Sequence, residues 1–168
     1  PSSSICGPDS TVTLPANAGK VDEEGEMVVV IGRRMRNVSA EDALSYVLGY
    51  TIGHDISARE WQSGDRSWWR AKGSDSFSPI GPFIETDYDP HGKNIVVTID
   101  DEEVQNCNTE EMIFSTQECL SFISRTNTLE PGDIVFTGTS GVTSRLRAGD
   151  NLVTKIDGLG ELHNSISD

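Results

Sequence analysis

The feature that most constrains the fold is a segment in which acidic residues run directly into an unbroken apolar stretch. It spans residues 21–32 and reads VDEEGEMVVVIG. The apolar part is rich in β-branched residues and too short to cross a membrane, so it predicts a buried strand over about 24–31. Residues two apart on a strand point to the same side, which places Glu24 and Glu26 together and leaves Gly25 bare on the opposite side.

Two carboxylates that face one way at the mouth of a buried strand repel each other and lose hydration. A hard divalent cation relieves both costs, because Mg²⁺ and Ca²⁺ take oxygen ligands. The alternative is that Glu24 and Glu26 are solvated charges at a strand end, and a short Glu-x-Glu pattern alone favours that interpretation. A third carboxylate is needed. Asp55, between apolar strand residues and a polar turn, is either that ligand or a turn residue that initiates a helix.

The rest of the chain predicts many short strands and two principal helices, hence an α+β fold, mostly β, with a mixed sheet. One helix is expected to begin at the N-cap Ser39 and to carry an apolar stripe through Val47 and Leu48, ending at Gly49. The other is expected over about 115–126, with Ser115 as N-cap and with Cys119, Leu120 and Ile123 facing inward. A short helical piece is expected at 58–62, and the strands are expected at 11–14, 50–57, 77–84, 94–100, 103–108, 134–137, 151–156 and 161–166.

Length and charge limit what the chain does. Its 168 residues suit one domain with a sizeable core, and the net charge of -14 argues against nucleic acid or an anionic membrane as a partner. Three widely spaced cysteines favour reduced thiols in an intracellular compartment. The chain shows no membrane-length apolar run and no signal-peptide pattern. It opens Pro-Ser-Ser-Ser without an initiator Met, so we expect a longer protein upstream.

Several motifs together resemble the fumarylacetoacetate hydrolase superfamily, in the family's order and over nearly the whole chain. Besides the segment at 21–32, they are GYTIGHDISAR at 49–59, AKGSDSFSPIGP at 71–82, PGDIVFTGT at 131–139 and the ending from 148 to 164. The His-Asp-Ile-Ser-Ala-Arg-Glu-Trp-Gln variant most resembles the branch of fumarylacetoacetate hydrolase domain-containing protein 2, which includes oxaloacetate tautomerases.

This resemblance implies a mixed β-sandwich roll of the family's C-terminal-domain type, usually a homodimer, with Mg²⁺ (or Mn²⁺ or Ca²⁺) held by Glu24, Glu26 and Asp55. It also implies an enzyme that acts on small 2-oxo acids through a metal-bound enolate. The chemistry agrees, because three carboxylates leave open positions on an octahedral ion and a 2-oxo acid can fill two of them.

The resemblance also implies roles for four further residues. Lys72 matches the active-site lysine, which holds a substrate carboxylate, orients water or shuttles a proton; otherwise it is an exposed ammonium. Arg59 and Gln62 match positions that contact substrate, and a guanidinium suits a second carboxylate. Thr139 would offer its hydroxyl to a substrate oxygen; without the other motifs its loop would be an ordinary turn.

Three departures from the family pattern bear on function. An acid, Glu23, stands where an aromatic is common, and we expect it to face away from the ligands. The segment 141–147 is shorter than the corresponding loop in many relatives. Catalytic relatives often carry a His and a Glu on a lid upstream of the region where this chain starts, and none of its histidines is placed like that pair. His54 should point to the opposite side of its strand from Asp55, so we interpret it as structural.

The preferred function is keto–enol tautomerisation of an oxaloacetate-like diacid. Acylpyruvate or fumarylacetoacetate-type C–C hydrolysis and oxaloacetate decarboxylation remain alternatives, since all three share an enolate and the same ligands serve each. A non-catalytic oligomerisation module with the same fold is the alternative from another class. A cytoplasmic or mitochondrial location is expected.

Overall fold

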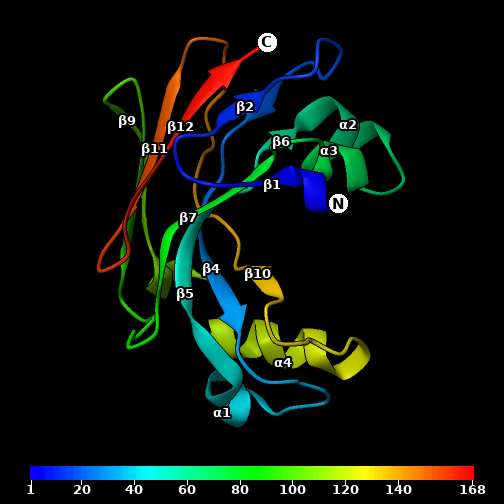
Figure 1. The fold of residues 1–168 in the computed structure, drawn as a ribbon, viewed down its shortest axis with the longest axis vertical. Helices are drawn as coiled ribbons and strands as arrows, with labels where there is room; N and C mark the ends of the chain where they lie inside the picture. Colours follow the sequence, from blue (N-terminus) through cyan, green and yellow to red (C-terminus); the bar gives the residue numbers. More distant parts are fainter.

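The acidic segment does enter a central strand of a two-sheet sandwich. The computed structural model describes residues 1–168, and the first sheet has the strand order β1-β7-β5-β4-β10 (Figure 1). β1 runs parallel to β7 and the other neighbours are antiparallel. The strands are β1 (Ile5–Cys6), β4 (Gly25–Ile31), β5 (Val47–His54), β7 (Ser78–Glu85) and β10 (Ile134–Phe136).

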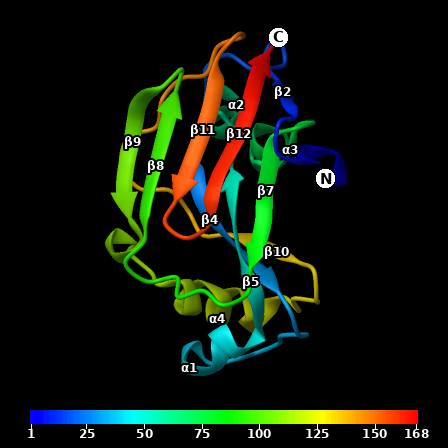
Figure 2. The ribbon, with the colours of Figure 1, turned by 60° about the vertical axis from the view of Figure 1, so that its left-hand side comes forward.

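The second sheet has the order β2-β12-β11-β8-β9 and is also mixed, because β2 runs parallel to β12 (Figure 2). β2 is an edge strand, and the strands predicted at 94–100 and 103–108 pair as one hairpin while those at 151–156 and 161–166 pair as another. The strands are β2 (Thr11–Thr13), β8 (Asn94–Ile99), β9 (Glu102–Asn108), β11 (Asn151–Ile156) and β12 (Gly160–Ser167). Two further strands, β3 (Val21–Asp22) and β6 (Ser57–Ala58), pair with each other.

Alternation along β4 builds the core between the sheets. Met27, Val29 and Ile31 lie on the same side of the strand as Gly25 and join a buried cluster that includes Ile95, Ile156 and Leu162 from the second sheet. A second buried cluster, centred on Phe77 and Leu152, fills the other end of the sandwich. The predicted mixed β-sandwich roll is therefore confirmed.

Helices are short and gather at two places. α1 (Ala40–Ala43) packs with α4 (Thr116–Thr126) at the end where β4 stops, and α2 (Arg59–Gly64) packs with α3 (Trp69–Gly73) near where β4 starts (Figure 1). Short 3₁₀ turns lie at Ser2–Ser4 (η1), Leu44–Tyr46 (η2) and Thr109–Glu111 (η3). No helix is long and apolar enough to cross a membrane.

The helix predicted from Ser39 to Leu48 is wrong in its second half. Ser39 does cap the helix, accepting a hydrogen bond from the Asp42 backbone N–H at 3.2 Å. However, α1 ends at Ala43 and β5 begins at Val47, which pairs with Ile31 of β4. Strand pairing with a buried neighbour outweighs the weak helical preference of a few apolar residues.

The predicted helix at 115–126 is confirmed, with one error in its inward face. Ser115 caps α4 in a capping box with Glu118, and Leu120 is fully buried. Cys119 is only half-buried and borders a surface hollow instead of lying in the core. Residues 119 and 120 are about 100° apart around a helix, so both cannot face the core centre.

Candidate metal centre

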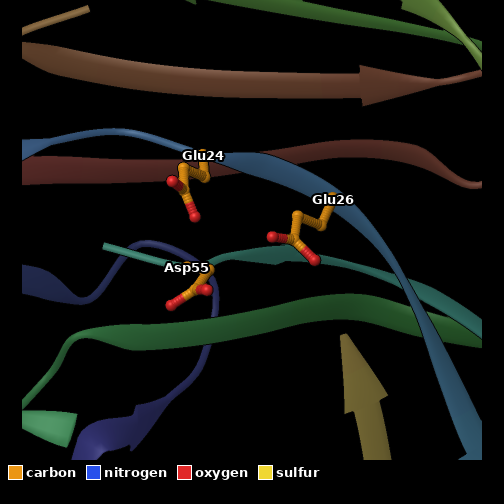
Figure 3. A group of neighbouring side chains, drawn as sticks. All are labelled: Glu24, Glu26 and Asp55. Atoms are coloured by element: carbon orange, nitrogen blue, oxygen red, sulfur yellow. The ribbon is translucent and has the colours of Figure 1, made fainter. Parts of the chain in front are cut away.

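Three carboxylates from two adjacent strand ends converge on one point. Glu24 and Glu26 come from the entrance of β4, and Asp55 directly follows β5 (Figure 3). One oxygen atom from each of the three lies within 4.8 Å of the other two. The backbone fixes this arrangement, because Glu26 pairs with Gly53 across the strands and the Asp55 N–H donates to the Glu24 carbonyl at 2.9 Å.

Gly25 lets the two glutamates reach this position. A Cβ on Gly25 would lie 2.5 Å from Cγ2 of Val97 and 2.7 Å from Oγ1 of Thr154, both on the second sheet. The bare side of β4 is therefore pressed against β8 and β11, and the glutamates project from its other side. A side chain at residue 25 would force the side chains of Val97 and Thr154, or the strands that carry them, to move.

Burial makes two of the three acids, Glu26 and Asp55, resist ionisation. Burial raises the pKa of Glu26 to about 8, and the nearby Asp55 and Glu24 carboxylates add to the shift. Burial likewise raises the pKa of Asp55 to about 6, although Lys72 opposes this change. Three converging carboxylates, two of them costly to ionise in the free chain, are a donor set that a hard divalent cation stabilises. The residues present therefore fit Mg²⁺, Mn²⁺ or Ca²⁺.

Lys72 places a positively charged side chain directly against the acidic cluster. It lies on α3, and its Nζ donates to Oε2 of Glu24 at 2.6 Å and to Oδ2 of Asp55. Burial alone would lower the pKa of Lys72, but the two carboxylates outweigh that effect and raise it. Lys72 is therefore a protonated ammonium that holds the acids together. It is not the exposed loop residue of the alternative interpretation.

Arg59 is also at the site, and each of the three nitrogens of its guanidinium has a partner within the chain. Nε donates to Asp22 at 2.9 Å, and Nη1 lies 2.7 Å from Oε1 of Glu24 and 3.0 Å from Oε1 of Gln62. Nη2 donates to the Thr143 hydroxyl at 2.8 Å. Arg59 therefore positions Glu24 and ties the loop at Thr143 to β3, and its predicted contact with substrate stays a prediction.

Gln62 lies beside the cluster through this arginine. Its carbonyl oxygen accepts from Arg59, which leaves the side-chain NH₂ without a partner in the protein. A substrate contact by Gln62 would therefore be a donated hydrogen bond. This agrees in kind with the predicted substrate-binding role, which itself stays a prediction.

Thr139 lies on the loop after β10, and its hydroxyl is 3.2 Å from the Gly25 carbonyl, the residue between the two glutamates. The neighbouring Gly138 N–H donates to Oε2 of Glu26 at 2.6 Å. The loop thus contacts both the backbone of Gly25 and the side chain of Glu26. A hydroxyl that donates to Gly25 must give up that bond to donate to a substrate.

Gln105 is a site residue that the sequence reasoning missed. It lies on β9 of the second sheet, is buried, and its NH₂ donates to the Thr139 hydroxyl at 2.8 Å and to the Ser140 carbonyl. The available signal was its inward register: Gln105 alternates with Cys107, which is also buried, whereas the other residues of β9 are exposed or half-buried.

Two neighbouring residues lie outside the cluster. Glu23 is fully buried, its Oε1 accepts from the Ser144 N–H at 2.8 Å, and burial raises its pKa to about 7. His54 points to the opposite side of β5, where its Nε2 lies 2.9 Å from the Thr154 hydroxyl, and burial lowers its pKa to about 3. His54 thus lies on the side of β5 opposite Asp55, as predicted, and its interpretation as a structural residue stays a prediction.

The family follows from sequence comparison. The profile described as "Fumarylacetoacetate (FAA) hydrolase C-terminal" matches residues 1–167, so the chain belongs to that family. Within it, a fumarylacetoacetate hydrolase domain-containing protein 2 homolog from Dictyostelium discoideum is 42% identical over 96% of this chain and 60% of the relative. A mitochondrial oxaloacetate tautomerase from Xenopus laevis is 39% identical over 98% of this chain and 55% of the relative. The chain thus spans little more than half the length of these relatives.

Solved structures agree on the fold. A 5-carboxymethyl-2-hydroxymuconate delta-isomerase from Mycobacterium smegmatis superposes with a TM-score of 0.97 at 38% identity, covering 99% of this chain and 66% of that one. A fumarylpyruvate hydrolase from Pseudomonas aeruginosa, in complex with Mn²⁺ and pyruvate, has a TM-score of 0.92 at 29% identity, covering 99% and 76%. The family therefore contains isomerases, hydrolases and tautomerases, and the family's members are enzymes.

Proposed function

We propose that this chain is the catalytic domain of a divalent-cation-dependent enzyme that acts on small 2-oxo acids. The observation that carries the proposal is the convergence of Glu24, Glu26 and Asp55 beside the ammonium of Lys72. The Mn²⁺ and pyruvate bound by the Pseudomonas aeruginosa fumarylpyruvate hydrolase support both a cation and a 2-oxo acid as ligands of this kind of site. When bound, a divalent cation would supply a Lewis acid for the substrate oxygens.

For the reaction we propose keto–enol tautomerisation of an oxaloacetate-type diacid. Support comes from the oxaloacetate tautomerase of Xenopus laevis, to which 98% of this chain can be aligned. Tautomerisation moves one proton from the enol oxygen to carbon and needs no water in the site. The Lys72 ammonium can donate that proton to carbon, and the resulting amine can accept the enol hydroxyl proton, so Nζ ends as it began.

The other residues would bind and orient the diacid. Gln62 has a free NH₂ donor for a substrate oxygen. Thr139, held by Gln105, stands with its hydroxyl beside the glutamate segment and can exchange its Gly25 bond for a substrate oxygen. Arg59 keeps Glu24 in place and contributes positive charge near a bound carboxylate.

Carbon–carbon hydrolysis of an acylpyruvate is the second candidate, and the fumarylpyruvate hydrolase neighbour favours it. Hydrolysis requires an activated water molecule in addition to the groups named above. Oxaloacetate decarboxylation shares the same binding groups. The three reactions differ in product: a tautomerase releases no pyruvate, a decarboxylase forms pyruvate and carbon dioxide, and a hydrolase of fumarylpyruvate forms pyruvate and a dicarboxylate.

The test is an ultraviolet assay of enol disappearance with oxaloacetate, and with acylpyruvates in parallel, in Mg²⁺, Mn²⁺ or EDTA. Pyruvate is measured separately with a coupled dehydrogenase. We expect cation-dependent loss of the enol without pyruvate. Glu26→Gln should abolish the rate, whereas Glu23→Gln, which changes a neighbouring buried acid outside the cluster, should keep it. Rates that are equal in EDTA and in Mg²⁺ would overturn the cation-dependent mechanism.

A non-catalytic module would behave differently in a binding assay. We expect Mg²⁺ and oxalate, an analogue of an enolised 2-oxo acid, to raise the melting temperature together, and Asp55→Ala to remove that effect. A folded chain with no rate and no thermal shift with either ligand would favour the module.

A further inference from the structure

The short loop at 141–147 lies against the segment that carries the glutamates of the acidic cluster. The Ser144 N–H donates to Oε1 of Glu23 at 2.8 Å, and the Glu23 N–H donates to the Ser144 carbonyl at 3.1 Å. These bonds hold the preceding residue of the loop, Thr143, beside Asp22, whose side chain is only 2% exposed. Neither Thr143 nor Asp22 has a part in the proposed reaction, although both contact the arginine that holds one of the cluster's acids.

Asp22, Thr143 and Arg59 form a closed triangle of hydrogen bonds. Arg59 Nε donates to Oδ2 of Asp22 at 2.9 Å, and Arg59 Nη2 donates to the Thr143 hydroxyl at 2.8 Å. The same hydroxyl donates to Oδ2 of Asp22 at 3.0 Å. An ionised carboxylate only accepts and a guanidinium only donates, so the direction of each bond is fixed by chemistry. The triangle therefore holds two of the three guanidinium nitrogens of Arg59.

The triangle leaves a single nitrogen of Arg59 for the acidic cluster. Nη1 lies 2.7 Å from Oε1 of Glu24 and also donates to Gln62. Arginine and carboxylate pairs often adopt a bidentate geometry, in which two N–H groups of one guanidinium bond both oxygens of the acid. Arg59 does not adopt it here, because its Nε and Nη2 bond Asp22 and Thr143. Glu24 therefore meets the guanidinium through one oxygen only.

A bidentate guanidinium would compete with a cation for Glu24. It would occupy both oxygens of one of the three carboxylates and bring its positive charge closer to the other two. Asp22 opposes this movement of Arg59, because it places a second buried carboxylate 2.9 Å from Nε. The triangle thus keeps the arginine close enough to orient Glu24 and prevents it from taking both oxygens.

We propose that Asp22 and Thr143 are positioning residues that tether Arg59, so that Arg59 orients Glu24 without competing with the cation. This role rests on the cation-binding function proposed above for the acidic cluster. It also gives the short loop at 141–147 a purpose, because the loop brings Thr143 to the triangle.

The test is isothermal titration calorimetry with Mn²⁺, without substrate, on variants of the triangle. Asp22→Asn removes the charge that holds Nε, and Thr143→Val removes the hydroxyl without changing any charge. Each should weaken Mn²⁺ binding at least about fivefold, because Arg59 is then released to bond Glu24 with two nitrogens. Thr143→Ser keeps the hydroxyl and should bind Mn²⁺ within about twofold of the wild-type affinity.

A double-mutant cycle separates this role from a merely structural one. In an Arg59→Met background no guanidinium is left to tether, so Asp22→Asn and Thr143→Val should each change Mn²⁺ affinity by no more than about twofold. Ser144→Ala is the matched control on the same loop. Its contacts with Glu23 are made by the backbone, so the wild-type affinity should persist. Melting temperatures measured without Mn²⁺ show that each variant is folded.

Two outcomes would overturn the role of the triangle while leaving the cation site intact. One is wild-type Mn²⁺ affinity in both Asp22→Asn and Thr143→Val. The other is an equal loss of affinity in the Arg59→Met background, which would show that the two residues act through the fold and not through Arg59. A wild-type chain that binds no Mn²⁺ would instead remove the proposed function, and the role of the triangle with it.

Discussion

Cation affinity should depend steeply on pH, and the magnitude follows from the buried acids. Burial raises the pKa of Glu26 from 4.5 to about 8 and that of Asp55 to about 6. A cation binds the ionised carboxylates, so protons compete with it. Between pH values of about 8 and 6, protonation of Glu26 weakens binding roughly 50-fold and that of Asp55 roughly twofold. Apparent affinity should therefore fall about 100-fold, or about 2.7 kcal/mol.

Isothermal titration calorimetry with Mn²⁺ measures this dependence directly. Titrations in buffers with different ionisation enthalpies should also show about one proton released per cation near neutral pH, mostly from Glu26. In the metal-free chain the same shifts act on stability. The native state binds more protons than the unfolded state between 4.5 and about 8, so stability should fall as pH rises through that window. The thermal shift produced by a cation should grow over the same range.

Two variants isolate the residue responsible. Glu26→Gln cannot release a proton, so its weaker cation binding should change only about twofold over the same pH range, through Asp55. Glu23→Gln removes a buried acid whose pKa is about 7 but which lies outside the cluster, and the steep dependence should persist. An affinity that changes less than about threefold in the wild-type chain, or an unchanged slope in Glu26→Gln, would refute the reasoning.

Four further variants, at three residues, test the surroundings of the cluster. Lys72→Met should lower the tautomerase kcat by roughly 10²–10⁴-fold. Lys72→Arg should keep the wild-type melting temperature but should also lose the tautomerase rate. A wild-type kcat in Lys72→Arg would exclude Nζ as the proton carrier. Gln105→Glu turns a donor toward Ser140 into a carboxylate that repels its carbonyl, so kcat should fall at least about tenfold while cation affinity stays constant, and an unchanged kcat would show that Thr139 needs no such support. His54→Phe should cost about 1–3 kcal/mol of unfolding free energy, because it leaves the buried Thr154 hydroxyl unpaired, and it should change kcat of the folded protein little. Loss of rate at an unchanged melting temperature would contradict a structural role for His54.

The ligand set was within reach of sequence reasoning because it depends on local rules. Glu24 and Glu26 share a side by strand alternation, and Asp55 joins them because β5 is the next long strand and pairs with β4. The family resemblance supplied the pairing that alternation alone could not. The sandwich likewise followed from short alternating strands separated by turn residues.

What escaped prediction depends on partners that are distant in sequence. Gln105 reaches Thr139 from the second sheet, so nothing near either residue signals the contact. The contacts of Arg59 with Asp22, Glu24 and Thr143 were not predicted either, because they exist only once three separate segments have met. The early end of α1 has the same origin, because Val47 pairs with Ile31 of β4 and therefore belongs to a strand and not to the helix.

The glycine between the two glutamates ties the chemistry of this protein to the thickness of its sandwich. A methyl group at Gly25 would press against the side chains of Val97 and Thr154. Any shift of β4 away from them would also move the carboxylates of Glu24 and Glu26. In the proposed metal centre, the position of the carboxylates and the spacing of the two sheets are therefore linked. Redesigning the proposed centre for a larger ion would therefore involve the packing of Val97 and Thr154 on the far side of β4 as well as the acids themselves.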